Sequence, residues 1–169
     1  AFLLTSPMAP LVEPGDEVLV PVVTWPTQVW SPKMAGLSVR LVDVDPNTLN
    51  LDFADLERKC GPRTRVVFPV HLMGNPCDMD RLVSFAKERD LIILEDCCEA
   101  LGSTWRGRKV GTFGLASAFS FFFSHHLVTM EGGMVCCNDA VVADHLRILR
   151  AHGWTRNVET ISFDPGQLD

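Results

Sequence analysis

The sequence lacks the features that would assign it to a membrane, nucleic-acid-binding or zinc-binding class. No apolar run reaches the ~18–20 residues that a membrane-spanning helix needs. The 15 lysines and arginines are scattered among 21 acidic residues and leave a net charge of −6, which argues against a nucleic-acid surface. No pair of cysteines has CxxC spacing, so support for a zinc site is weak and we predict no metal site.

The six cysteines are therefore read as ordinary thiols. Four of them form the adjacent pairs Cys97-Cys98 and Cys136-Cys137. Because neighbouring residues in a strand point to opposite faces, each pair is expected to pack as small apolar side chains. Such cysteine usage suits a reducing compartment, so we expect a cytoplasmic protein.

Both ends of the sequence lack the signals of a complete chain. The opening Ala1-Phe2-Leu3-Leu4 has no initiator methionine and no signal-peptide n-region, and residues 162–169 contain no closing element. We therefore expect the chain to be the interior of a longer polypeptide. Its 169 residues correspond to one domain or to part of one.

Short apolar runs alternate with amphipathic stretches, which predicts a packed α/β protein. The composition is 47% hydrophobic and 21% charged, which excludes disordered, collagen-like and coiled-coil classes. Strands are predicted at 17–21, 39–44, 65–70, 91–96, 116–122 and 133–137, with a tight hairpin turn at 105–109. Helices are predicted at 26–34, 52–59, 78–89 and 140–150. This alternation favours parallel βαβ units covered on both faces.

Ligands of such sheets bind beyond the carboxyl ends of the strands, which directs attention to four positions. Asp96 ends an apolar strand and is equally consistent with a cofactor contact or with a helix cap or buried ion pair. Trp25 could stack on a flat ring, although a core tryptophan is commoner. His71 could contact a ligand or be structural. The pair His125-His126, taken alone, is more often structural than catalytic.

A set of short motifs stands in one order along the chain. The motifs are PGDEVLVP (14–21), TWPT (24–27), VDVDPNT (42–48), PVHLMGNP (69–76), LED (94–96), GRKVGTFG (107–114), FSF (119–121), EGG (131–133) and LRAHG (149–153). Each motif alone is weak, but the ordered set over residues 11–157 is specific. The set resembles the DegT/DnrJ/StrS-type sugar aminotransferase family of fold-type I pyridoxal-phosphate (PLP) enzymes.

The resemblance implies a three-layer α/β fold with a mixed, mostly parallel sheet. Residues 1–157 would form part of the PLP-binding large domain, and residues 158–169 would begin a linker toward a missing C-terminal region. It also implies cofactor-binding roles for four residues. Asp96 would pair with the pyridine nitrogen, Trp25 would stack on the ring, and Ser120 would bind the phosphate. Glu99 lies near the position where the family often has a glutamine that faces the cofactor.

One departure from the family pattern is informative. Five residues after the phosphate-binding serine, the family has the lysine that binds the cofactor covalently, but this chain has His125. Lys33 and Lys109 lie elsewhere in the motif order and do not replace it. The substitution is similar to the branch of 4-keto-6-deoxyhexose 3-dehydratases, which use the cofactor in its pyridoxamine phosphate (PMP) form. The resemblance therefore implies 3-dehydration of a nucleotide-linked 4-keto-6-deoxyhexose, with His125 as the catalytic base.

Two alternatives stay open from the sequence: a sugar aminotransferase of the same family, and a catalytically silent relative kept for assembly or binding. The resemblance also implies a homodimer with a shared active site, and a glutamate co-substrate or partner reductase that regenerates the amine form. The family's phosphate cradle would lie upstream of residue 1. The 169 residues alone are therefore expected to be inactive.

Overall fold

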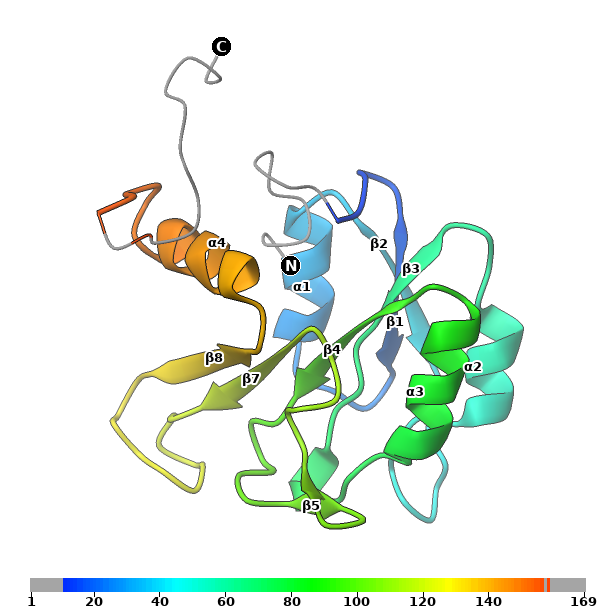
Figure 1. Cartoon of the computed structure of the whole chain (residues 1–169). Coiled ribbons are helices and arrows are strands. Elements are labelled where there is room, and N and C mark those ends of the chain that lie inside the picture. The colour runs from blue at the N-terminus through cyan, green and yellow to red at the C-terminus, as the bar shows by residue number, and fades with distance from the viewer. Residues whose placement is uncertain (1–10, 157, 159–169) are drawn as a thin grey trace.

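A six-stranded sheet forms the centre of the molecule (Figure 1). The structure, a computed structural model, describes residues 11–156 and 158. The strands are β1 (Glu17–Pro21), β2 (Ser38–Val42), β3 (Thr64–Val67), β4 (Ile92–Asp96), β7 (Ala116–Ser120) and β8 (Gly133–Cys137). They lie in the order β2-β1-β3-β4-β7-β8, and only the β7–β8 pair is antiparallel. The predicted mixed, mostly parallel sheet is confirmed.

Helices cover the sheet on both sides. The helices are α1 (Thr27–Met34), α2 (Phe53–Lys59), α3 (Met79–Glu88) and α4 (Ala140–Arg150). Helices α2 and α3 pack their apolar residues against Leu19, Val67 and Ile93 on one face. The chain around α1 packs against the alternate sheet residues Val18 and Val66 on the other face. Helix α4 follows β8 and lies beside it (Figure 1). The predicted three layers are therefore present.

Local sequence signals explain where the helices begin. The side chains of Asp52, Asp78 and Asp139 each accept a hydrogen bond from the backbone N–H three residues further on, at 2.8–3.1 Å. Such caps satisfy N–H groups that the first helical turn leaves without a partner. Helix α1 has no side-chain cap and starts after Pro26, whose fixed φ suits a helix entry.

Four of the six predicted strands are shorter in the structure, two of them by two residues, and one element was not predicted. The strand expected at 65–70 ends at Val67, because Pro69 has no N–H to donate to a neighbouring strand. Val70 forms only an isolated bridge with Asp96. The strand expected at 116–122 ends at Ser120, where the chain enters a loop. The short 3₁₀ helix η1 (Leu72–Gly74) has no signal in the sequence.

The remaining elements agree with the predictions or lie beyond the described residues. The hairpin predicted at 105–109 is the pair β5 (Thr104–Trp105) and β6 (Arg108–Lys109). Apart from Val158, the linker predicted at 158–169 falls outside the described residues. In the part of the chain that the structure describes, no helix combines the length and apolar character needed to cross a membrane.

Candidate active site

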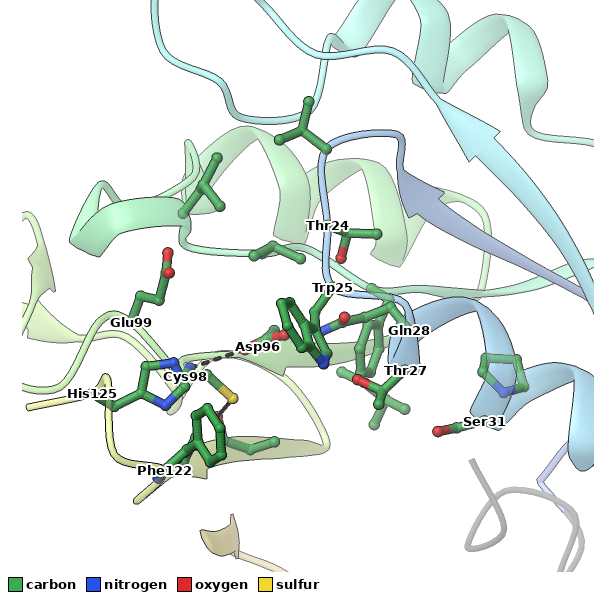
Figure 2. A pocket seen from close by; sticks show the side chains of 18 of the residues that line it. Thr24, Trp25, Thr27, Gln28, Ser31, Asp96, Cys98, Glu99, Phe122 and His125 are labelled. Carbon is green, nitrogen blue, oxygen red and sulfur yellow. Dashed lines mark hydrogen bonds between the residues drawn. The ribbon is translucent and has the colours of Figure 1, made fainter. Parts of the chain in front are cut away.

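A cavity of about 720 Å³ opens beyond the carboxyl ends of β1, β4 and β7 (Figure 2). Its volume lies within the range of ~300–1,000 Å³ that is usual for small-molecule sites. Residues far apart in the sequence meet here because β1, β4 and β7 run in the same direction. The five predicted site residues all line this cavity: Trp25, Asp96, Glu99, Ser120 and His125.

Asp96 is fixed at the end of β4 by its backbone on both sides. Its N–H donates to the Pro69 carbonyl at 2.9 Å, and its carbonyl accepts from the His71 N–H at 3.0 Å. Carboxylate oxygen Oδ1 accepts a 2.9 Å hydrogen bond from the Cys98 N–H. The side chain is only 6% exposed, and no ion pair joins it to a basic residue of the described chain. A buried carboxylate of this kind suits a cationic ligand group.

Ser120 and His125 approach the cavity from the chain segment at and beyond the end of β7. Ser120 Oγ accepts a hydrogen bond from the Phe122 N–H at 3.2 Å, which leaves its hydroxyl proton for a ligand. The His125 N–H donates to the Phe122 carbonyl at 3.0 Å, and its ring packs edge-on against the Phe122 ring. His125 Nδ1 is buried and has no hydrogen-bond partner. His126 is exposed and does not line the cavity, so the two histidines diverge as expected.

Trp25 and Glu99 complete the predicted set from two other loops. Trp25 follows β1 and is 70% exposed, so its ring is free to stack on a planar ligand. Glu99 Oε2 accepts a hydrogen bond from the Met73 N–H at 2.7 Å. Met73 has a φ of 52°, in the left-handed region that costs energy for a non-glycine residue. Glu99 therefore also holds the η1 turn beside the cavity.

The charged side chains of the cavity are unbalanced. Asp96, Glu99 and Glu131 line it, whereas none of its described lining residues is a lysine or arginine. Lys109 instead donates through Nζ to the Gly102 carbonyl at 2.9 Å. A ligand with a cationic ring nitrogen would thus find a carboxylate partner in the cavity, but no lysine amine there to bind it covalently.

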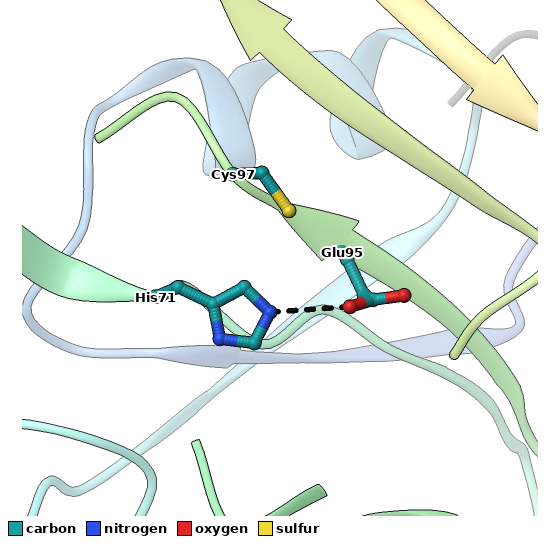
Figure 3. A group of neighbouring side chains, drawn as sticks. All are labelled: His71, Glu95 and Cys97. Atoms are coloured by element: carbon teal, nitrogen blue, oxygen red, sulfur yellow. Dashed lines mark hydrogen bonds and ion pairs between the residues drawn. The ribbon is translucent and has the colours of Figure 1, made fainter. Parts of the chain in front are cut away.

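His71, one of the candidate ligand contacts, is structural (Figure 3). Its side chain is fully buried and does not line the cavity. Nδ1 accepts from the Cys77 N–H at 3.1 Å, which leaves the Nε2 proton to donate to Glu95 Oε2 at 3.2 Å. Glu95 also accepts three backbone hydrogen bonds of 2.7 Å from Gly111, Phe113 and Gly114.

The His71–Glu95 pair and Cys97 place three possible metal-ligand atoms within 4.8 Å of one another (Figure 3). A metal ion would need a lone pair on a histidine nitrogen and free carboxylate oxygens. Both His71 nitrogens and both Glu95 oxygens are already in hydrogen bonds. Burial raises the pKa of the Cys97 thiol, which favours its protonated form. The geometry indicates a hydrogen-bond network that fixes the loop 111–114 to β4.

The family of the chain is decided by a comparison with protein-family models. The model of the DegT/DnrJ/EryC1/StrS aminotransferase family matches residues 2–164. The chain belongs to this family. Its resemblance to the DegT/DnrJ/StrS-type enzymes, which rested on ordered short motifs, is thereby confirmed.

Two curated relatives from the DegT family are similar to the chain over most of its length. Over 158 residues the chain is 43% identical to GDP-4-keto-6-deoxy-D-mannose 3-dehydratase of Yersinia pseudotuberculosis, covering 94% of this chain and 40% of the relative. It is 44% identical over 146 residues to GDP-perosamine synthase of Caulobacter vibrioides, covering 86% and 39%. The chain thus spans about 40% of the length of these curated relatives.

A solved structure of a DegT-family dehydratase shares the fold. The E. coli GDP-4-keto-6-deoxy-D-mannose-3-dehydratase with bound hydrated PLP matches with a TM-score of 0.88 and 41% identity, covering 93% of this chain and 40% of that chain. The large-domain fold expected of fold-type I PLP enzymes is therefore shown. The chain is about equally identical to the dehydratase and to the synthase, so percentage identity does not distinguish these two activities. The residues of the cavity have to distinguish them.

Some residues that line the cavity were not predicted. Thr24, Gln28 and Cys98 line it beside the predicted residues. Cys98 follows Asp96 by two positions, and burial raises the pKa of its thiol. Gln28 could have been found from its place at the start of the predicted helix 26–34, three residues beyond Trp25.

Proposed function

We propose that the full-length protein is a PLP/PMP-dependent dehydratase that removes the 3-hydroxyl of a nucleotide-linked 4-keto-6-deoxyhexose. One observation supports this reading above the others. A histidine, and no lysine, lines the cavity beyond β7, and its buried Nδ1 has no hydrogen-bond partner. An orphaned nitrogen in a ligand cavity is suited to proton transfer.

The residues present fit the cofactor. Asp96, buried and without a basic partner, would hold a protonated pyridine nitrogen. Trp25 would stack on the ring, Ser120 would donate its hydroxyl proton to the phosphate, and Glu99 would face the ring from the η1 side. When bound in its amine form, the cofactor supplies a nucleophilic nitrogen for the sugar ketone and an electron sink.

His125 is assigned the proton transfer. As an imidazole without a covalent link to the cofactor, it can accept a proton at an unpartnered ring nitrogen and donate it again when the 3-hydroxyl leaves. A ring nitrogen with a free lone pair can accept a proton and return it, so one imidazole can serve both steps. Asp96 has a separate role, as the partner of the ring cation, and takes no part in the proton transfer.

The relatives named above suggest the wider setting of the reaction. Two of them are GDP-sugar enzymes by name, so a GDP-linked hexose is the first substrate to test. We propose a cytoplasmic homodimer whose subunits share the active site. We also propose that either glutamate or a partner reductase regenerates the amine form of the cofactor.

The decisive variant is His125→Asn in the full-length protein. Dehydration is expected to fall by ~10²–10⁴-fold, the usual contribution of a general acid–base group. Cofactor binding is expected to persist, because Asp96, Trp25 and Ser120 are unchanged. The assays are release of the 3-deoxy sugar from GDP-4-keto-6-deoxy-D-mannose and the absorbance of the bound cofactor.

Two further variants separate the alternatives. His126→Asn is the matched control and should have a small effect, since His126 lies outside the cavity. His125→Lys should shift the cofactor toward a lysine-bound form with a new absorbance band. The assay of the wild-type protein tests the two alternatives directly. Addition of an amine to the sugar would identify an aminotransferase, and an unchanged sugar would identify a silent relative. Either outcome refutes the dehydratase proposal.

A further inference from the structure

Helix α1 has polar side chains on the side that faces the cavity and apolar side chains on its exposed side. A helix that covers a sheet normally presents its apolar stripe inward. Here Thr27, Gln28 and Ser31 line the cavity, whereas Trp30 and Met34 are 63% and 73% exposed. The polar side of α1 is therefore the side that meets the cavity, which is the arrangement expected of a ligand-binding wall.

Two polar atoms on this side of the cavity, one on α1 and one in the loop between β1 and α1, are buried without partners. Gln28 is only 6% exposed, and its carbonyl oxygen Oε1 has no hydrogen bond. The hydroxyl oxygen of Thr24, one residue before Trp25, has none either. Figure 2 shows both side chains beside Trp25, with the Gln28 amide directed toward the part of the cavity that holds Asp96. Buried polar groups without partners are rare, so their clustering in one cavity points to a ligand.

The chemistry of the wall selects an uncharged ligand group. Among the described lining residues, the α1 side of the cavity has no lysine or arginine to pair with a phosphate, and the cofactor phosphate is assigned to Ser120 on another element. Thr24 and Gln28 offer neutral donors and acceptors, while Val66, Leu94 and Ala118 make the opposite wall apolar. A hexose fits this combination, because it presents hydroxyl groups at its edge and C–H groups on its faces.

We propose that Thr24 and Gln28 form the hexose subsite of the cavity and hydrogen-bond to the 2-hydroxyl of the sugar, the hydroxyl that the reaction leaves in place. The proposal rests on the proposed function for the identity of the ligand. It assigns the two residues to substrate recognition, separate from the cofactor contacts of Asp96, Ser120 and Trp25. Gln28 would then contribute to affinity for the sugar and not to the fold.

The test uses the full-length protein with cofactor, in a His125→Asn background so that the sugar is not consumed. Two probes are compared by equilibrium binding: GDP-4-keto-6-deoxy-D-mannose and GDP. Gln28→Leu, which keeps the volume and removes the amide, should weaken binding of the nucleotide sugar about tenfold. Binding of GDP and of the cofactor should be unchanged. The Tm without ligands should not fall, because Oε1 has no partner to lose.

Asn50→Leu is the matched control for a buried amide. Asn50 donates to the Pro76 carbonyl at 2.9 Å and accepts from the Cys77 thiol, so its removal should lower the Tm and spare sugar selectivity. The subsite proposal is wrong if Gln28→Leu lowers the affinity for both probes equally, lowers the affinity for the cofactor, or leaves the affinity for the nucleotide sugar unchanged. Selective sugar binding by wild-type protein that never dehydrates would refute the proposed function and leave the subsite standing.

Discussion

Adjacent residues at the end of β4 have opposite tasks. Glu95 and Asp96 follow one another in a strand, so their side chains point to opposite faces of the sheet. Glu95 is 1% exposed and is saturated by hydrogen bonds from His71 and the loop 111–114. Asp96 accepts a single N–H and faces the cavity. Carboxylates side by side in sequence therefore serve the fold and the site respectively.

The pH dependence of stability should reveal Glu95. Burial alone would raise the pKa of Glu95, but the His71 N–H and three backbone N–H groups outweigh it and hold the pKa below its ordinary value of 4.5. A carboxyl with a lower pKa in the folded state stabilises the fold above pH 4.5, and the contribution disappears as pH falls through the folded pKa. Tm measured from pH 7 down to pH 3 should lose the Glu95 contribution only below about pH 4.5.

Glu95→Gln tests whether Glu95 stabilises the fold in this pH-dependent way. The variant should lose about 1–3 kcal/mol of unfolding free energy at pH 7, because an amide leaves part of the buried N–H groups around it without an acceptor. Its Tm should also depend less on acid. Glu57→Gln is the control, because Glu57 is half exposed and meets Arg81 only at 3.4 Å. Equal acid dependence of wild type and Glu95→Gln would contradict the role given to Glu95.

At the scale of elements, the loop 111–114, which lies between β6 and β7 in the chain, packs against β4. A Cβ added to Gly114 would lie 2.4 Å from the Ile93 carbonyl oxygen in β4, a contact that backbone cannot relieve cheaply. The close approach also lets the Gly114 N–H reach Glu95. The glycine-containing motif at 107–114 is thus explained by packing against β4, which ends in Asp96.

Gly114→Ala should destabilise the full-length protein by about 1–3 kcal/mol, as overpacking does. Gly61→Ala is the matched control, because the nearest atom to an added Cβ there is 3.7 Å away and is the end of the Glu17 side chain. Urea unfolding of both variants gives the difference. A Gly114→Ala protein as stable as Gly61→Ala would show that the loop can move away from β4.

At the scale of the whole molecule, much apolar surface is exposed. In β8, which ends the sheet among the described strands, Met134 and Val135 are 47% and 51% exposed. Phe123 and Met130, in the loop before it, are 69% and 80% exposed. An open strand edge with apolar neighbours is a surface that another chain segment can cover.

We therefore predict that the 169-residue chain, prepared by itself, associates at high concentration. Light scattering should give a mass above that of one chain, rising with concentration. Met134→Lys combined with Val135→Lys should reduce the association, because charges on an edge strand oppose pairing. Monodisperse, monomeric behaviour of the unmodified chain would contradict the prediction.

The sequence by itself determined most elements and the candidate residues of the site. Aspartate caps and helical spacing located α2, α3 and α4 to within a residue or two, because these signals act over three or four neighbours. Apolar runs located β1, β4 and β8 for the same reason. The ordered motifs identified Trp25, Asp96, Ser120 and His125, although their roles stay predictions.

Only the tertiary structure decided which of these residues share a cavity and which do not. Trp25 and Asp96 meet because β3 alone separates β1 from β4 in the sheet, a strand order that no local signal encodes. The same order sends His71 into the core with Glu95 and leaves the Gln28 carbonyl buried without a partner. Burial and hydrogen-bond partners depend on contacts between distant segments, whereas helix caps and strand patterns depend on neighbours in the chain.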